Sequence, residues 1–114
     1  MTLSSLTIGT IATQYLTPAF DEETLDYTVT VGAPSVATSH LYMTINAVAS
    51  EQNADISYEM TGARGKIDFV VVDNVPKIDI HNIAREAVTA TLKIKVSNEG
   101  MNPTTYTVTV STTV

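Results

Sequence analysis

Apolar and polar residues alternate in two segments of this chain. In residues 25–31 every second side chain is apolar, beginning with Leu25 and Tyr27, and the residues between them are aspartate or threonine. Residues 105–110 repeat this arrangement, with Tyr106 and two valines opposite three threonines. A period of two places alternate side chains on opposite faces of a strand. Both segments are therefore predicted as β-strands with one face in a hydrophobic core.

Threonine and aliphatic residues predict further strands of the same kind. The chain contains 19 threonines, and β-branched side chains pack well on a pleated surface. A first strand is expected at residues 3–8, and its continuation past Gly9 to Leu16 is left open. Four more strands are expected between the two alternating segments, at residues 41–49, 56–60, 66–72 and 87–96. The expected total is about seven strands.

Turn-forming residues separate the predicted strands. They cluster at residues 16–18, 32–35, 61–65 and 97–100. All four prolines lie outside the predicted strand interiors, as a sheet requires, because proline has no N–H to donate. Short strands with regular turns favour an all-β fold, an immunoglobulin-like two-sheet antiparallel β-sandwich. The length of 114 residues fits a single domain that covers residues 1–114.

One segment, residues 77–86, has no clear pattern. Ile80 and Ile83 fit a helical period together with two alanines that follow them. The same residues alternate too poorly for a confident strand assignment. A helical turn, a strand and a long crossover between the sheets all remain open for this segment.

Composition and charge exclude several classes of function. Twelve acidic and six basic residues give a formal net charge of −6, which disfavours binding to nucleic acid and to anionic membranes. The absence of cysteine excludes disulfides, thiolate metal sites and thiol nucleophiles. The sequence shows neither a transmembrane segment nor a signal peptide. We expect either a complete product made inside the cell or a domain cut from a longer exported protein.

Four stretches together resemble the bacterial cadherin-like β-sandwich family, whose modules are immunoglobulin-like. They read LSSLTI at 3–8, LTPAFD at 16–21, LDYTVTV at 25–31 and TYTVTV at 105–110. The resemblance spans the chain, although residues 77–86 lack the glycine and asparagine element usual for the family. It implies that Pro18 and Phe20 turn the chain and plug one end of the sandwich. It also implies a display, spacer or adhesion module without catalytic residues, and it does not imply calcium.

The two histidines are the main candidates for chemistry. His81 follows Asp79 by two residues, so on an extended strand the two side chains share a face, as metal ligands or acid–base partners do. A third ligand is missing from the local sequence. We therefore favour a surface imidazole beside a carboxylate, and we expect His40 to be a solvated loop residue.

Other candidate motifs favour structural interpretations. The acidic run at residues 21–23 is expected to be a solvated loop tip, because nothing in the sequence builds a cleft around it. Residues 62–67 lack the spacing of a phosphate-binding loop, and Arg64 and Lys66 are expected at a hairpin tip. Asp73 and Asn74 are predicted to form a turn rather than a calcium site. Met101 is either a contact residue or folded back over the sandwich.

The sequence therefore predicts no catalytic, cofactor-binding or metal-binding residues, and its binding residues are undefined. We expect a non-enzymatic structural or interaction module that binds a protein partner, with no nucleic acid and no membrane, and that is compatible with an oligomer. The leading expectation is a decoration or head-fibre protein on the virion surface of a tailed bacteriophage, bound to a repeated capsid surface. The alternative is a spacer, adhesion or carbohydrate-binding module of a secreted protein on the bacterial cell surface.

Overall fold

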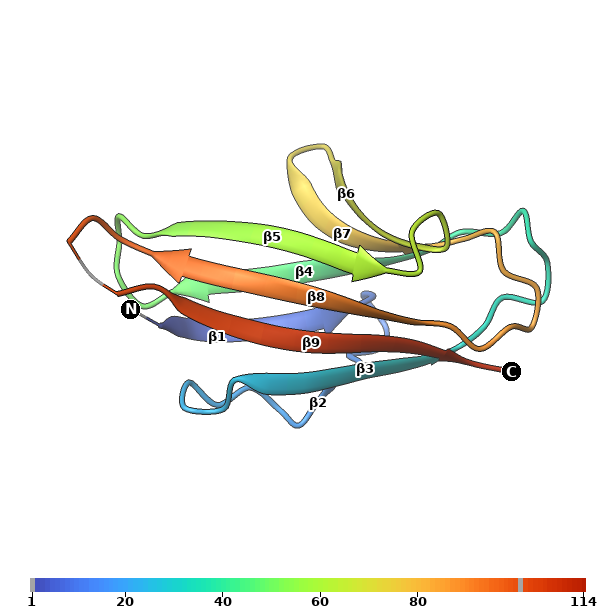
Figure 1. The fold of residues 1–114 in the computed structure, drawn as a ribbon, viewed down its shortest axis with the longest axis horizontal. Helices are drawn as coiled ribbons and strands as arrows, with labels where there is room; N and C mark the ends of the chain where they lie inside the picture. Colours follow the sequence, from blue (N-terminus) through green and yellow to red (C-terminus); the bar gives the residue numbers. More distant parts are fainter. Residues whose placement is uncertain (1, 101) are drawn as a thin grey trace.

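The computed structural model, which describes residues 2–100 and 102–114, is a sandwich of two β-sheets (Figure 1). One sheet has four strands in the order β1 (Leu3–Gly9), β4 (Leu41–Ala49), β7 (Val75–Ile80) and β6 (Ile67–Val72). The other has five in the order β2 (Leu16–Thr17), β3 (Asp26–Gly32), β9 (Thr104–Thr113), β8 (Thr89–Ser97) and β5 (Asp55–Gly62). The all-β sandwich predicted from the sequence is confirmed. The described residues include no helix that could cross a membrane.

The hydrophobic core lies between the two sheets and follows the predicted alternation. In β3 the side chains of Tyr27, Val29 and Val31 are buried while the residues between them are exposed. In β9 the buried face begins with Tyr106. Inward-facing aliphatic residues of β1, β4, β7 and β8 complete the same core. Alternation at period two therefore determines which face of each strand is buried in the core.

The structure has nine strands among the described residues, and one strand pair is parallel. β3 and β9 run in the same direction, with Asp26 beside Thr107 at one end and Gly32 beside Thr113 at the other. The other strand pairs are antiparallel. The prediction of about seven antiparallel strands therefore missed β2, β7 and this parallel pair. Pairing between segments so distant in sequence leaves no mark in the pattern of either strand.

Residues 77–86, for which the sequence left three conformations open, form the end of strand β7 and then a crossover between the sheets. β7 runs through Ile80, and the chain then passes to the other sheet without forming a helix. Asn82 and Arg85 have φ values of 53° and 52°, which interrupt a right-handed helix. Ile83 lies between them and is fully buried. The apparent helical period thus reflects the burial of an isoleucine within a loop.

The prediction that all prolines lie outside strands is wrong for Pro76, the second residue of β7. Pro76 lies beside Val71 of β6. The pairing of β7 with β4 spans Lys77 to Ile80 and leaves Pro76 outside it. A proline at this position therefore costs β7 no hydrogen bond to β4.

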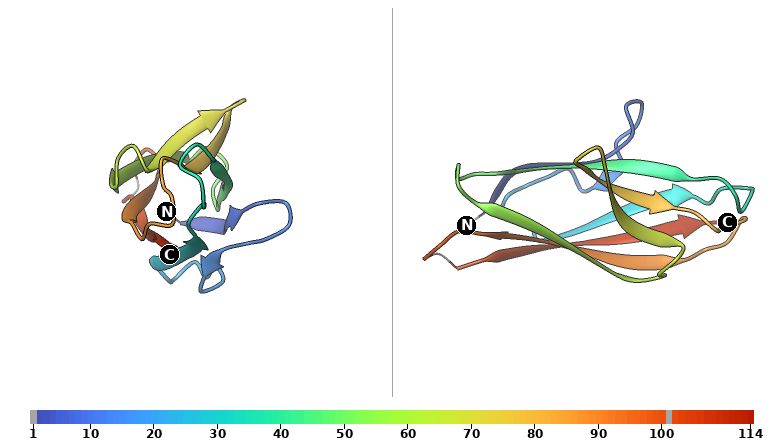
Figure 2. Two further views of the ribbon diagram at one scale, coloured as in Figure 1. Left: turned by 90° about the vertical axis from the view of Figure 1, so that its right-hand side faces the viewer. Right: turned by 90° about the horizontal axis from the view of Figure 1, so that it is seen from above.

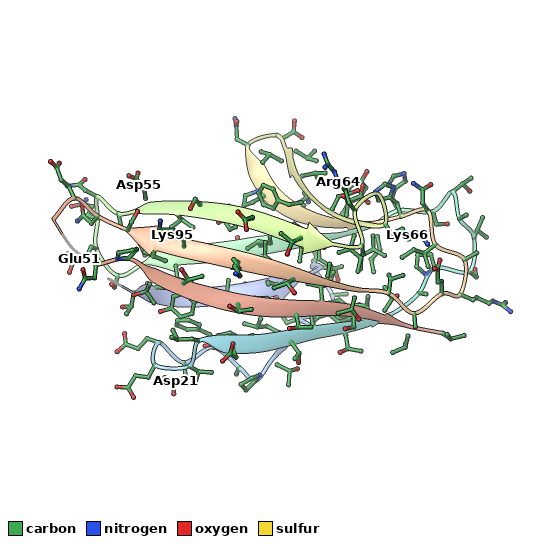
Figure 3. All side chains as sticks on the ribbon, in the orientation of Figure 1. Asp21, Glu51, Asp55, Arg64, Lys66 and Lys95 are labelled. Carbon is green, nitrogen blue, oxygen red and sulfur yellow. The ribbon has the colours of Figure 1, made fainter. Side chains whose placement is uncertain are left out.

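The β6–β7 hairpin, residues 67–80, extends beyond the sheet at its turn (Figure 1). Asp73 and Asn74 form the predicted turn, and both have positive φ, 52° and 64°, as a type I′ hairpin turn requires. The expected hairpin tip at Arg64 and Lys66 is wrong, because β5 and β6 belong to different sheets. Arg64 and Lys66 lie in the crossover that follows β5 (Figure 3).

Two buried tyrosines anchor the loop before β3. The Phe20 ring packs against Tyr27 and Tyr106, with centroid distances of 6.1 and 5.9 Å. The Tyr27 hydroxyl donates to the Asp21 carbonyl at 2.7 Å and accepts from the Asp21 N–H at 3.0 Å. The Tyr106 hydroxyl donates to the carbonyl of Glu22 at 3.2 Å. Phe20 thus covers the core tyrosines, and their hydroxyls hold the loop in place.

The molecule is elongated, with principal extents of 46 × 27 × 26 Å. The strands run roughly along the long axis. β1 begins at one end of the sandwich and β9 finishes at the other (Figures 1 and 2).

Candidate functional site

Three neighbouring strands place polar side chains in a row on the outer face of the four-stranded sheet. Asp68 of β6 lies directly beside Asp79 of β7, and Asp79 lies beside Tyr42 of β4. His40 immediately precedes β4 and His81 immediately follows β7. The two imidazoles of the chain therefore lie beside each other on one side of this row.

The strand pattern of β7 explains why Asp79 faces outward. Its neighbours Ile78 and Ile80 are fully buried in the core, so the aspartate between them points to the opposite face. The Asp79 side chain is nevertheless only 9% exposed, whereas that of His40 is 45% exposed. Asp79 is therefore a nearly buried carboxylate on the outside of a sheet, covered by polar neighbours.

Both imidazoles contact carboxylates. His40 Nδ1 lies 3.0 Å from Asp79 Oδ1 and 3.2 Å from its Oδ2. His81 Nε2 lies 2.7 Å from Asp68 Oδ2 and 3.8 Å from Asp79 Oδ2. An ionised carboxylate can only accept hydrogen bonds, so each of the close ring nitrogens donates to its carboxylate. Asp79 thus contacts both histidines.

The aromatic rings of this cluster form a stack. The ring of His40 lies between those of His81 and Tyr42, at centroid distances of 5.1 and 5.5 Å. The interplanar angles are 9° and 6°. The stack fixes the direction in which both imidazoles present their nitrogens.

Asp68 is held in its charged form. Burial acts to raise the pKa of its carboxyl group, but the N–H of Gly65, the hydrogen bond from His81 and the nearby charges of His81 and Arg64 outweigh it and lower the pKa overall. Gly65 donates to Asp68 Oδ1 at 3.0 Å from a backbone with φ of +84°. The crossover after β5 thus supplies a fixed dipole to the carboxylate.

The cluster, defined as His40, Asp68, Asp79 and His81, has two kinds of chemistry open to it. Its imidazole nitrogens and carboxylate oxygens are ligands that divalent transition metals accept. The same groups could also share protons, as histidine–carboxylate pairs do. His40, Asp79 and His81 each offer one ligand atom, and these atoms lie within 4.8 Å of one another.

Sequence analysis found half of this cluster. It placed Asp79 and His81 on one face, and the structure confirms that they approach one another. Asp68 was not predicted. His40 is an exposed loop residue, as expected, but its ring also contacts Asp79, which the sequence did not indicate. Asp68 of β6 is 13 residues from its partner His81, and His40 is 39 residues from its partner Asp79. Neither pair could therefore be found in the local sequence. The sequence signal that pointed to His40 was its position directly before the strand predicted at residues 41–49.

Other sequence candidates remain separate from the cluster. The side chains of Asp21, Glu22 and Glu23 are exposed in the loop before β3, and Figure 3 shows Asp21 there. An open groove of about 470 Å³ adjoins the cluster through Asp68. Its seven lining residues come from β5, β6 and the crossover between them: Met60, Gly62, Arg64, Ile67, Asp68, Phe69 and Val70. Met101 lies outside the described residues.

Comparisons with protein-family models, with curated proteins and with solved structures found no match to this chain. The resemblance to the cadherin-like family therefore rests on the four sequence stretches, and function has to be argued from the structure itself.

Proposed function

We propose that this chain is a non-enzymatic structural or interaction module, and that it decorates the virion surface of a tailed bacteriophage by binding a repeated capsid surface. The observation that carries the proposal is the projecting β6–β7 hairpin. Val71 and Val72 are 60% and 41% exposed there, beyond the pairing with β4. Apolar side chains on a projecting element are suited to contact another protein.

Charge supports a protein partner. The net charge of −6 opposes association with nucleic acid and with anionic lipid. A small contact of this kind is weak by itself, but a repeated surface multiplies it over many copies. The hairpin would then act as the contact element and the sandwich as its rigid support.

The test is the protein content of purified virions and the binding of hairpin variants to capsids. Mass spectrometry should detect the chain in many copies per particle. Val71→Lys should reduce its occupancy on capsids, whereas Val48→Lys, at an equally apolar site that is 53% exposed on β4, should not. Absence of the chain from virions would end this proposal.

A second candidate function, a spacer or adhesion module on the bacterial cell surface, is supported by the position of the chain ends. Modules joined in series need their ends at opposite poles, and β1 and β9 meet this condition (Figure 2). The native reading frame distinguishes the two functions. Further modules and an export signal in that frame would favour the spacer, and a glycan array would test adhesion to carbohydrate.

A further inference from the structure

The cluster of His40, Asp68, Asp79 and His81 brings two carboxylates and two imidazoles together on one face of the four-stranded sheet. Asp68 and Asp79 occupy directly opposite positions on adjacent strands. Like charges in such positions repel each other. A cation near them would reduce this repulsion, and both histidines contact Asp79 from the side on which their rings stack.

We propose that these four residues bind one divalent transition metal ion, Zn²⁺, and that the ion fastens β6, β7 and the segment before β4. The proposal is independent of the function proposed above. It requires only the geometry of the outer sheet face.

The separations between ligand atoms fit a single ion. Four ligands at about 2.0–2.2 Å from Zn²⁺ in a tetrahedron lie roughly 3.3–3.6 Å from one another. The distances from carboxylate oxygens to ring nitrogens are 2.7 Å for Asp68 with His81, 3.0 Å for Asp79 with His40, and 3.8 Å for Asp79 with His81. The ligand atoms of His40, Asp79 and His81 all lie within 4.8 Å of one another, so side-chain rotation can bring these three to that range. Asp68, which contacts His81, is the fourth ligand of the proposal, and the ion would replace the protons that the ring nitrogens donate in its absence.

The donor set selects the class of ion. Ca²⁺ and Mg²⁺ prefer sites made of oxygen atoms alone, and Cu⁺ prefers sulfur. Two imidazoles with two carboxylates suit Zn²⁺, and the two negative charges balance the charge of the ion. Four protein ligands also close the coordination sphere, which is the arrangement of structural rather than catalytic zinc.

The surroundings allow the ion to enter and hold the ligands in place. The His40 side chain is 45% exposed and forms the accessible side, whereas that of Asp79 is 9% exposed and forms the base. The N–H of Gly65 donates to Asp68 Oδ1, which leaves Oδ2 directed at His81. Such hydrogen bonds to a ligating carboxylate orient it for the metal.

The experiment titrates the chelator-treated full chain with ZnCl₂ by isothermal titration calorimetry and repeats the titration with CoCl₂ in the visible range. We expect one saturable Zn²⁺ site per chain and the intense visible absorption of four-coordinate Co²⁺. Zn²⁺ should displace the cobalt signal. Absence of saturable Zn²⁺ binding would overturn the proposal.

Variants assign the site to these residues. Loss of one ligand should weaken Zn²⁺ binding by at least about tenfold, since even supporting residues of zinc sites cost 10–100-fold. Asp79→Asn, His81→Gln and His40→Gln should each show this loss, and His40→Gln, at the most exposed position, decides the matter if Asp79→Asn does not fold. Asp26→Asn, exposed on β3 of the other sheet, is the control. Unchanged affinity in His40→Gln and His81→Gln would refute the assignment.

Discussion

At the scale of single residues, two glycines at strand ends differ sharply in the space around them. A Cβ atom on Gly9 would collide with the Thr13 carbonyl oxygen and would lie 2.8 Å from the Cα of Gln14. Gly9 pairs with Gln14 through an isolated bridge, so backbone stands on both sides of the contact. At Gly32 an added Cβ meets nothing within 4 Å.

We therefore expect opposite effects from the same substitution. Gly9→Ala should lower the free energy of unfolding by about 1–3 kcal/mol through overpacking. Gly32→Ala should leave it unchanged or raise it by up to about 1 kcal/mol, because alanine restricts the unfolded chain. Urea denaturation of the two variants measures both values. Equal effects would contradict the close approach of the 13–14 backbone to β1.

The buried phenol of Tyr106 leads to a second prediction at the residue scale. Burial raises the pKa of its phenol above the ordinary value of 10.0, and the hydrogen bond from the N–H of Leu3 partly opposes this rise. Burial also raises the pKa of Tyr58. Above pH 10 the phenols of the unfolded chain ionise, while those of the folded chain stay protonated. The free energy of unfolding is therefore fully present below pH 10 and falls as the pH rises, until the phenols of the folded chain ionise as well.

Denaturation measured between pH 8 and about 12, with phenolate absorbance as the titration signal, checks this expectation. Tyr106→Phe should be less stable at pH 8, because it loses the hydrogen bonds to Leu3 and Glu22. Its stability should then fall less steeply with pH than that of the parent chain. A steeper fall would contradict the assignment.

At the scale of elements, the strands that could be predicted are those in which threonine and aliphatic residues alternate. β3 and the middle of β9, residues 105–110, follow this pattern. β7 escaped prediction for two reasons: Lys77 and Asp79 put charged side chains on its outer face, and Pro76, an unusual residue within a strand, precedes the buried Ile78 and Ile80 on the inner face. The two-residue strand β2 is too short to have a period.

The candidate cluster could be predicted only in part for a different reason. Asp79 and His81 are neighbours in sequence, so strand geometry alone puts them together. Asp68 and His40 reach them through the register of β6 on β7 and of β4 on β7. Register is set by the packing of the inner face, and no local pattern reports it.

The β6–β7 hairpin gives a prediction at the element scale. Asn74 has φ of 64°, which asparagine and glycine tolerate and valine does not. Asn74→Val should destabilise the protein by about 1–2 kcal/mol, whereas Asn74→Gly should stay within about 0.5 kcal/mol of the parent. Chemical denaturation measures both variants. Equal stability would show that the turn has a different backbone conformation.

At the scale of the whole molecule, the proposed metal ion joins the β6–β7 hairpin to the segment before β4, which is distant from it in sequence. A ligand that binds only the folded state stabilises it by about 2.7 kcal/mol at a free concentration of 100 times Kd. For a domain of 114 residues, that free energy corresponds to a rise in melting temperature on the order of 10 °C. Scanning calorimetry with Zn²⁺ and with excess chelator measures the difference, and His81→Gln should reduce it.

The opposite placement of the two chain ends determines how the molecule responds to a pull. Tension between the start of β1 and the end of β9 acts along the strands, so β1 slides against β4 and β9 slides against β3 and β8. In this shearing direction all the hydrogen bonds of a ladder resist together, whereas in peeling they break one after another. A filament built from such units would stretch very little before its first domain gives way.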